Sequence, residues 1–368
     1  MYKNRIYYTV FALLFTVLIG HSQENDSTLK EVYKNDFKIG FSIGWNRHLK
    51  DTTSINLALN ESNVITPGNP LKWIRLVNDK GEYDFSLADE MIDFAEKNNL
   101  KVVGHTLIWH MQTPKWVFED ENGKLASKEL VMERMEAHIK KVVGRYKGRI
   151  YAWDVVNEAV DTFGKKMFRD SKYIEIFGDE EFIELAFKWA HEADPEAKLY
   201  YNDYFCFLPE KRNHIFNLLK GLLDKGTPID GIGMQSHYNV HSPSVEEIRN
   251  TFEIFKTLGI EVNVSELDMG MIGLFDRKAN QFADSIPNEM LIVQAFKYAE
   301  LFEIYKEYSD IIDRVTIWGT TDKYSWLNGR PFKKRVEYPL LFDRNGKKKP
   351  AYWGAMRPKD WYLIYKCK

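Results

Sequence analysis

The sequence predicts an α/β protein that forms a single (β/α)8 barrel, also called a TIM barrel. Eight short β-rich segments alternate with helical segments, and the chain of 368 residues is long enough for one such barrel. In addition, polar and aromatic residues gather where the β-rich segments end. The alternative is an open doubly wound sheet, which is disfavoured because the sequence lacks the glycine-rich first turn of that fold.

The predicted strands are short and rich in β-branched and aromatic residues, which favour an extended backbone. In chain order they cover residues 38–43, 54–59, 101–109, 150–157, 198–204, 231–237, 260–267 and 314–318. Apolar residues at helical spacing between them predict helices at 87–98, 130–146, 180–192, 210–225, 245–258 and 289–308. We expect residues 338–355 to form a last loop and a helix that closes one end of the barrel.

The N-terminus has the pattern of a secretory signal. Lys3 and Arg5 precede an apolar run at 10–19, and Gly20 and Ser22 are small residues of the kind that a signal peptidase reads. We therefore expect a signal peptide at 1–22, a short polar linker at 23–30 and a single barrel domain at 31–368. The apolar run is short for a membrane span, although an uncleaved anchor is the alternative. The mature protein is expected to be secreted or periplasmic.

Composition excludes several classes of function. The chain has 51 basic and 53 acidic residues and a net charge of -2, which gives no electrostatic basis for binding nucleic acid or an anionic membrane. The two cysteines, Cys206 and Cys367, are expected to be free thiols. No zinc-ligand spacing and no glycine-rich phosphate loop is present, so we expect no metal and no cofactor. A monomer is the default expectation.

Two predicted strands end in a glutamate. Residues 150–159 read I-Y-A-W-D-V-V-N-E-A and deliver Glu158, and residues 260–267 read I-E-V-N-V-S-E-L and deliver Glu266. The carboxyl ends of barrel strands build the active site. The fourth and seventh strands lie on opposite sides of an eight-stranded barrel, so the two carboxyl groups would face each other. Cleavage of a glycosidic bond needs such a pair; the alternative is that each glutamate belongs to a structural ion pair.

Other polar and aromatic residues accompany this pair. His237 and Asp268 come at the ends of the sixth and seventh strands, where a histidine hydrogen-bonded to Glu266 would hold it ionised and Asp268 would orient the histidine. Glu158 would then be the proton donor with the raised pKa. His237 could instead be a core histidine, and the tryptophans could be simple packing. The remaining strand ends deliver His105, Trp109, Gln112, Asn157, Tyr204, Gln235, Trp318 and Trp326.

Six motifs together resemble a known family. They read G-H-T-L-I-W-H-M-Q-T-P-K-W at 104–116, W-D-V-V-N-E-A at 153–159, Y-N-D-Y at 201–204, G-I-G-M-Q-S-H-Y at 231–238, S-E-L-D-M at 265–269 and T-I-W-G-T-T-D-K-Y-S-W-L at 316–327. In this order they span nearly the whole chain after the signal. The sequence thus resembles the glycoside hydrolase family 10 endo-β-1,4-xylanases.

The resemblance implies a retaining hydrolase of xylan that needs no cofactor. Glu158 would be the acid/base, and Glu266 the nucleophile that forms a covalent glycosyl-enzyme. Asn157 would bind the 2-hydroxyl of the sugar at the cleavage point, Gln235 and His237 would support the nucleophile side, and Tyr204 would line the leaving-group side. The substrate-binding residues that the resemblance implies are Asn69, Lys72, His105, Trp109, Gln112, Asn157, Tyr204, Gln235, Trp318 and Trp326.

One position departs from the family pattern. The stretch T-P-G-N-P-L-K-W at 66–73 keeps Asn69 and Lys72, but Gly68 stands where the family has a glutamate that grips the second sugar. Losing such a group costs about 1.5–3 kcal/mol of binding, unless Glu61 or Asn63 reaches in. Two alternatives stay open, and Gly68 motivates the first. One is a retaining glycanase of altered specificity, for decorated or mixed-linkage xylan or for β-1,4-glucan, and the other is an inactive carbohydrate-binding barrel.

Overall fold

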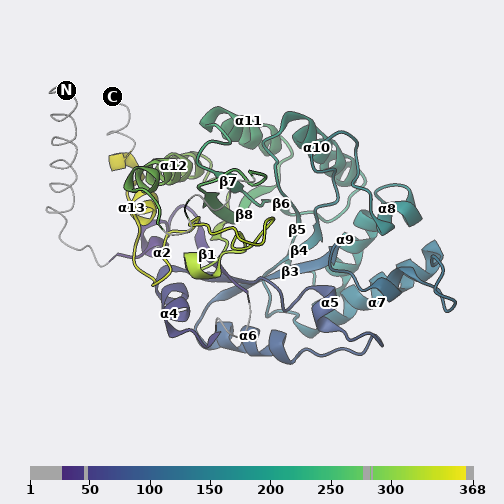
Figure 1. Ribbon diagram of the computed structural model, residues 1–368. Helices are drawn as coiled ribbons and strands as arrows, with labels where there is room; N and C mark the ends of the chain where they lie inside the picture. Colours follow the sequence, from purple (N-terminus) through teal and green to yellow (C-terminus); the bar gives the residue numbers. More distant parts are fainter. Residues whose placement is uncertain (1–26, 45–48, 277–281, 283–284, 362–368) are drawn as a thin grey trace, which may run out of the picture.

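Eight parallel strands close into a barrel in the computed structural model, which describes residues 27–44, 49–276, 282 and 285–361 (Figure 1). Each barrel strand pairs in parallel with both neighbours, and the pairings β1–β9 and β6–β8 close the ring. The predicted (β/α)8 barrel is confirmed. Its strands are β1 (Lys38–Ile43), β2 (Val64–Pro67), β3 (Lys101–Trp109), β4 (Ala152–Asn157), β5 (Lys198–Asp203), β6 (Gly231–Met234), β8 (Glu261–Gly270) and β9 (Arg314–Ile317).

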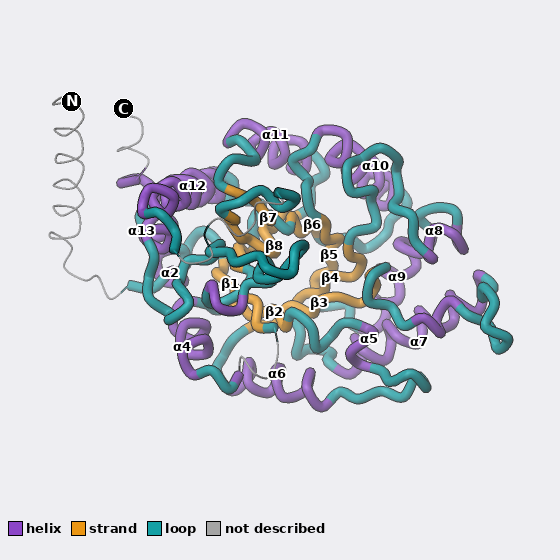
Figure 2. The backbone as a smooth tube through the Cα atoms, viewed as in Figure 1, coloured by secondary structure: helices purple, strands orange, loops and turns teal. Residues whose placement is uncertain are grey.

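Helices surround the barrel on its outside (Figure 2), and the main hydrophobic core fills the space between them and the strands. Within the described part of the chain, no helix combines the length and the apolarity that crossing a membrane requires. The helices are α2 (Leu29–Val32), α4 (Thr52–Glu61), α5 (Trp73–Leu76), α6 (Ser86–Lys97), α7 (Lys128–Arg145), α8 (Lys172–Phe177), α9 (Glu181–Ala193), α10 (Pro209–Asp224), α11 (Val245–Lys256), α12 (Asn288–Glu307) and α13 (Pro350–Met356), with 3-10 turns at Lys115–Phe118 and Asp322–Tyr324.

The second predicted strand was wrong. Residues 54–59 belong to helix α4, and the barrel strand β2 follows at Val64–Pro67. The helix buries Ser54, Ala58 and Glu61, which lie on one helical face at a spacing of four and three residues. Because these residues are small or polar, the sequence shows no apolar residues at helical spacing there. The order S-I-N-L-A-L instead resembles the alternating pattern of a strand.

Other boundaries differ in smaller ways. The sixth predicted strand, 231–237, breaks after Met234 because Ser236 has a left-handed backbone with φ 57°, and a short strand β7 (His237–Asn239) then pairs with β8. Leu29 was assigned to the linker but is fully buried in α2, so packing on the barrel begins before residue 31. Cys206 is a buried free thiol. The predicted signal peptide at 1–22 and Cys367 lie outside the described residues.

Close packing inside the barrel fixes β3 against β4. Trp153 of β4 is fully buried, and a Cβ atom at Gly104 of β3 would lie 2.1 Å from its ring, so only glycine fits there. On the same strand, Asp154 lies 3.4 Å from the guanidinium of Arg314, which also stands over the ring of Tyr200 at 4.5 Å. This buried polar layer positions the residues above it at the carboxyl end of the barrel.

Candidate active site

Residues that follow three neighbouring strands have a left-handed backbone conformation, which directs them into the cleft. Glu158 after β4, Phe205 after β5 and Ser236 after β6 have φ angles of 60°, 53° and 57°. A left-handed backbone at a residue other than glycine costs on the order of 1–3 kcal/mol, and such strain gathers at functional sites. The carboxyl ends of β4, β5 and β6 are therefore shaped for the cleft and not only for barrel packing.

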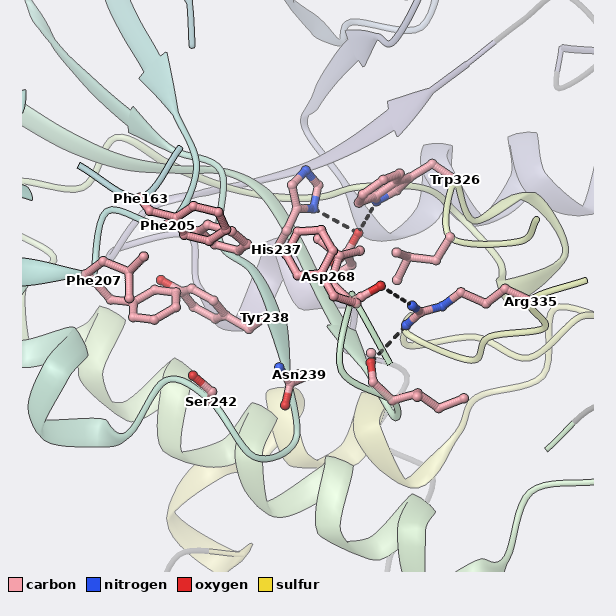
Figure 3. A pocket seen from close by; sticks show the side chains of 16 residues that line it. Phe163, Phe205, Phe207, His237, Tyr238, Asn239, Ser242, Asp268, Trp326 and Arg335 are labelled. Atoms are coloured by element: carbon pink, nitrogen blue, oxygen red, sulfur yellow. Dashed lines mark hydrogen bonds and ion pairs between the residues drawn. The ribbon is translucent and has the colours of Figure 1, made fainter. Parts of the chain in front are cut away.

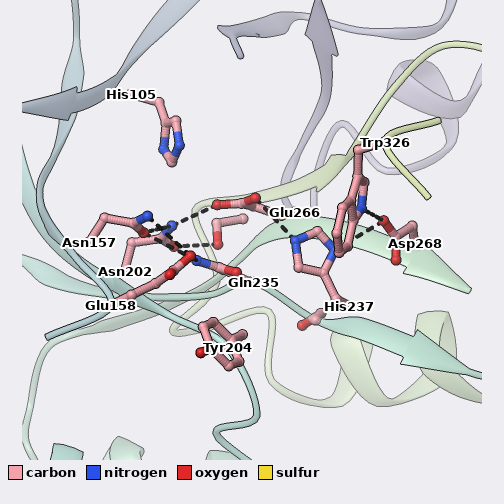
Figure 4. Close-up of polar contacts among 12 residues, drawn as sticks. His105, Asn157, Glu158, Asn202, Tyr204, Gln235, His237, Glu266, Asp268 and Trp326 are labelled. Atoms are coloured by element: carbon pink, nitrogen blue, oxygen red, sulfur yellow. Dashed lines mark hydrogen bonds and ion pairs between the residues drawn. The ribbon is translucent and has the colours of Figure 1, made fainter. Parts of the chain in front are cut away.

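Glu158 is surrounded by neutral hydrogen-bond donors (Figure 4). Its Oε2 accepts from Trp109 Nε1 at 3.0 Å, and its Oε1 accepts from Gln235 Nε2 at 3.0 Å and from Asn157 Nδ2 at 3.2 Å. The side chain is 8% exposed. Burial raises the pKa of Glu158, the hydrogen bond from Gln235 opposes this only in part, and the charges of Asp203 and Glu266 add to the rise. This carboxyl group is thus suited to hold a proton.

Glu266 has a cationic partner instead. His237 Nε2 lies 3.2 Å from its Oε2, and Asn202 Nδ2 donates to its Oε1 at 2.7 Å. Burial acts to raise the pKa of Glu266, but the hydrogen bond from His237, the electrostatic effects of His105 and His237 and the hydrogen bond from Asn202 together outweigh it and hold the pKa below its ordinary value. This group is thus suited to stay ionised.

The predicted pair of His237 and Asp268 is in place. His237 Nδ1 lies 3.0 Å from Asp268 Oδ2, which also accepts a hydrogen bond from Trp326 Nε1 at 2.7 Å. Burial acts to lower the pKa of His237, but Asp268 and Glu266 outweigh it and raise the pKa to about 10. The imidazole is therefore a cation near neutral pH, and it lies between the two carboxylates.

The two glutamates are three strand positions apart around the barrel, because β5 and β6 separate β4 from β8. This is one position short of the diametrically opposed arrangement that the sequence predicted. Asn202 of β5 spans the distance, since its Nδ2 donates to Asn157 Oδ1 at 2.9 Å and to Glu266 Oε1 at 2.7 Å. Sequence reasoning gave Asn202 no role, although the motif Y-N-D-Y at the end of a strand pointed to it.

The predicted side chains on β3 and after β2 face the same cleft. His105 donates from Nδ1 to Asp154 Oδ2 at 2.9 Å, and its ring meets Trp318 edge to face at 5.3 Å. Lys72 is buried with its ammonium group 4.8 Å from the Trp109 ring. Burial lowers the pKa of Lys72 to about 8, against the charges of Glu266 and Glu158, which act to raise it.

Asn69 and Gln112 are among the predicted residues that make no described contact with Glu158 or Glu266. Asn69 Nδ2 donates to the backbone oxygen of Gly44 at 3.3 Å. Gln112 carries a buried Oε1 that has no hydrogen-bond partner among the described residues. Gln235 does contact a glutamate, but it donates to Glu158 and not to the nucleophile side, so that expectation was wrong. The turn at Ser236 separates Gln235 from His237 and directs them to different glutamates.

Tyr204 is held by cations that the sequence analysis missed. Its hydroxyl accepts a hydrogen bond from Arg169 and is hydrogen-bonded to Thr162 at 2.9 Å. The ammonium group of Lys211 stands 3.8 Å from the Tyr204 ring and 2.7 Å from Asp203, in a fully buried pair. Arg169 lies in a loop and Lys211 in helix α10, and only tertiary packing brings these elements close to Tyr204. No local sequence pattern therefore predicted the contacts.

At Gly68 the structure explains why glycine fits. A Cβ atom there would lie 2.8 Å from Ser42 Oγ. Glu61 and Asn63 do not replace the missing glutamate: Glu61 is buried and accepts the backbone N–H of Leu29 at 2.9 Å, and Asn63 accepts the backbone N–H at the start of β1. The place therefore lacks the acceptor that these two residues could have supplied.

Comparison with known proteins identifies the family of this chain. The sequence model of glycosyl hydrolase family 10 matches residues 28–358. The chain belongs to this family of glycoside hydrolases. An endo-1,4-β-xylanase of Geobacillus stearothermophilus is 42% identical over 326 residues, covering 89% of this chain and 97% of that protein. A β-1,4-xylanase of Dictyoglomus thermophilum is 43% identical over 350 residues, covering 94% of this chain and 96% of that protein.

Solved structures of the family superpose on the chain. A xylanase of Paenibacillus barcinonensis, solved with a conduramine derivative, has a TM-score of 0.86 and 40% identity, covering 91% of this chain and 99% of that one. A GH10 endoxylanase from a sugarcane soil metagenome has a TM-score of 0.85 at 41% identity, covering 89% and 98%. Within the described residues, no group of three or more His, Cys, Asp or Glu side chains forms a metal-binding cluster.

Proposed function

We propose that this hydrolase cleaves internal β-1,4-xylosidic bonds of xylan with retention of configuration and without a cofactor. The observation that carries the mechanism is the opposite shift of two carboxyl groups at one cleft: the pKa of Glu158 is raised and that of Glu266 is lowered. A proton donor and an ionised nucleophile are the two groups that this reaction needs. The choice of xylan is supported by the xylanases at 42% and 43% identity.

In the first step, the Glu266 carboxylate attacks the anomeric carbon while the bond from that carbon to the leaving oxygen breaks. Glu158 gives its proton to this oxygen, so the shortened polymer departs as an alcohol. In the second step, water attacks the same carbon and gives a proton to Glu158, and Glu266 departs as a carboxylate. Two inversions at one carbon give net retention, and both glutamates return to their starting protonation states.

The surrounding residues bind the sugar chain in this proposal. Asn157 and His105 lie beside the carboxyl groups and offer hydrogen bonds to ring hydroxyls, while Lys72 offers its ammonium group. The indole rings form flat apolar walls of the kind on which sugar faces pack. The substrate-binding set is Asn69, Lys72, His105, Trp109, Gln112, Asn157, Tyr204, Gln235, Trp318 and Trp326.

We propose further that residues 1–22 are a secretory signal and that the mature, monomeric protein acts outside the cytoplasm. The charged start, the apolar run at 10–19 and the small residues that follow support this. Mass spectrometry of the N-terminus of protein collected from the cell envelope and from the medium would test it. An intact Met1 in both fractions contradicts cleavage, and light scattering of the purified protein gives the oligomeric state.

The first experiment measures reducing-sugar release from linear xylan, arabinoxylan, glucuronoxylan, mixed-linkage xylan and carboxymethyl-cellulose. Glu158→Ala and Glu266→Ala accompany the wild type, with the surface variant Glu175→Ala as a control for folding and handling. Activity on xylan that both active-site variants abolish supports the proposal. A folded wild-type protein that hydrolyses no xylan rejects it, and binding without turnover would indicate an inactive carbohydrate-binding barrel.

Gly68 favours a second candidate, a retaining glycanase of altered specificity. The missing acceptor removes a contact to an undecorated second sugar, and Ser42 Oγ, which would lie 2.8 Å from a Cβ atom at this position, occupies part of its place. The same panel separates the candidates. Equal or faster hydrolysis of carboxymethyl-cellulose would favour a glucanase, and faster hydrolysis of arabinoxylan or glucuronoxylan than of linear xylan would favour a decorated substrate.

A further inference from the structure

An apolar pocket adjoins the catalytic residues. It has a volume of about 290 Å³ and is lined on one side by Phe163, Phe205 and Phe207 and on the other by Trp326 and Arg335 (Figure 3). Ligand pockets for drug-sized molecules begin at roughly 300 Å³. The pocket is thus large enough for a ring-sized group.

Two exposed phenylalanines close the pocket from separate loops. Among the described phenylalanines, only Phe163 and Phe275 are exposed, at 49% and 60%. The Phe163 ring lies 6.3 Å from that of Phe205 at an angle of 24°, and 6.4 Å from that of Phe275 at 57°. Exposed apolar side chains that gather in one place mark binding sites. These separations fall within the range of about 4.5–7 Å at which aromatic rings interact, so a planar ring could join the cluster.

The charged side chains of the pocket are largely committed to one another or to the backbone. Arg335 forms an ion pair with Glu337 and donates to the backbone oxygens of Ile272 and Leu274. One carboxylate oxygen of Asp268 accepts from His237 and Trp326, whereas Asp268 Oδ1 is buried with no hydrogen-bond partner among the described residues. A sugar ring would bury several hydroxyl groups against these walls, and unpaired buried polar groups are unfavourable. A planar ring with a single hydroxyl avoids that cost.

The pocket is continuous with the reaction site. His237, Asp268 and Trp326 both line it and form the support of Glu266. Its opposite wall comes from the loops that follow Glu158 and Tyr204, which serve the leaving-group side in the proposed mechanism. An occupant of the pocket would therefore be attached to the sugar chain at or just beyond the cleavage point.

We propose that this pocket binds a phenolic acyl group, of the hydroxycinnamoyl kind, that is esterified to the xylan on the leaving-group side of the cleaved bond. The phenylalanine rings would stack on its aromatic ring, and the phenolic hydroxyl would donate to Asp268 Oδ1. The inference rests on the proposed xylanase function, because it names a decoration of that substrate.

The test compares one feruloylated arabinoxylo-oligosaccharide with the same compound after mild alkaline removal of the ester. The wild type is compared with Phe163→Ala, Phe275→Ala and the double variant. Leu125→Ala, which also shortens an exposed apolar side chain, is the matched control. We expect the wild type to have the higher kcat/KM on the ester. The double variant should lose about tenfold in kcat/KM on the ester alone, and Leu125→Ala should change neither rate.

Each outcome bears on one proposal. Equal losses on both substrates would mean that the phenylalanines bind the sugar chain, which overturns the acyl proposal. An absence of any advantage for the ester in the wild type overturns it as well. Methyl ferulate added to the de-esterified substrate distinguishes a free phenol from an attached one: strong inhibition without any preference for the ester also rejects the proposal. Failure of the wild type on both compounds and on linear xylan would instead overturn the proposed function.

Discussion

Glu158 and Glu266 have matching positions and opposite chemistry. Glu158 directly follows β4 and Glu266 lies in the second half of β8, both follow a polar residue, and they are 8% and 4% exposed. Glu158 accepts hydrogen bonds from three neutral donors, whereas Glu266 accepts from one neutral amide and from the cation His237. Burial acts to raise the pKa of both groups, and only for Glu266 do the partners His237, His105 and Asn202 together reverse the direction.

Burial alone therefore does not assign a role to a carboxyl group. Neutral donors stabilise the ionised form too little to offset desolvation, whereas a neighbouring positive charge does so. Asp268 is what keeps that charge in place, because it raises the pKa of His237. The chain Asp268–His237–Glu266 therefore contributes to the division of labour between acid and nucleophile, together with His105 and Asn202.

The largest expected effect separates the two roles directly. Glu266→Ala should abolish turnover of every substrate, since no nucleophile remains. Glu158→Ala should lower kcat/KM on xylan by about 10²–10⁴-fold. It should retain a burst of product from an aryl xylobioside with an acidic phenol, because that leaving group departs without a proton. Stopped-flow absorbance measures the burst. A burst from Glu266→Ala would show that Glu266 is not the nucleophile. The absence of a burst from Glu158→Ala would contradict its assignment as the acid.

A second expected effect comes from the cation. His237→Asn removes the positive charge beside Glu266 but keeps a side-chain amide. A hydrogen bond to a charged group is worth about 1.5–3 kcal/mol, so kcat/KM at neutral pH should fall about ten- to hundredfold. The acid limb of the pH profile should move to higher pH, because the pKa of Glu266 rises, while the alkaline limb of Glu158 stays in place. His191→Asn, on the outer helix α9, is the control. A shift of the alkaline limb instead would contradict the pairing.

Much of this site followed from the sequence because strand order in a barrel fixes spatial order. Glu158, Glu266, His237 and Asp268 were each placed at a strand end, and they meet as expected. The second strand was misread because α4 buries small and polar residues, so its letters carried no helical signal. The barrel itself remained predictable, since seven other strands alternate with helices.

The contacts that could not be predicted from the sequence depend on local backbone turns and on residues that are distant in sequence but close in the fold. A regular strand would send Gln235 and His237 to the same face, but the left-handed Ser236 separates them toward different glutamates. Asn202 bridges the two halves of the site only because β5 lies between β4 and β6. Arg169 and Lys211 reach Tyr204 from outside the barrel strands, and no spacing rule relates them to it.

A third expected effect comes from Lys72, which acts on both glutamates. The charges of Glu266 and Glu158 act to raise the pKa of Lys72, and by reciprocity its ammonium group favours their ionised forms. Lys72→Met should therefore move both limbs of the kcat/KM profile to higher pH. In the wild type this charge is lost above about pH 8, so wild type and variant should converge at high pH. Lys115→Met, on an exposed lysine, is the control, and a shift of only one limb would show that Lys72 serves one glutamate.

The smallest expected effect concerns a neutral donor. Gln235 Nε2 donates to Glu158 Oε1, and this bond holds the pKa of Glu158 lower than burial alone would set it. Gln235→Ala should therefore raise the pKa of Glu158 further and move the alkaline limb of the kcat/KM profile to higher pH, with the acid limb unchanged. A neutral hydrogen bond is worth about 0.5–1.5 kcal/mol, so the rate at neutral pH should fall only severalfold. Gln235→Glu adds a negative charge and should move the same limb in the same direction by more. If Gln235→Ala moved the acid limb, Gln235 would serve the nucleophile after all, and the contrast between neutral and cationic partners would lose its structural basis.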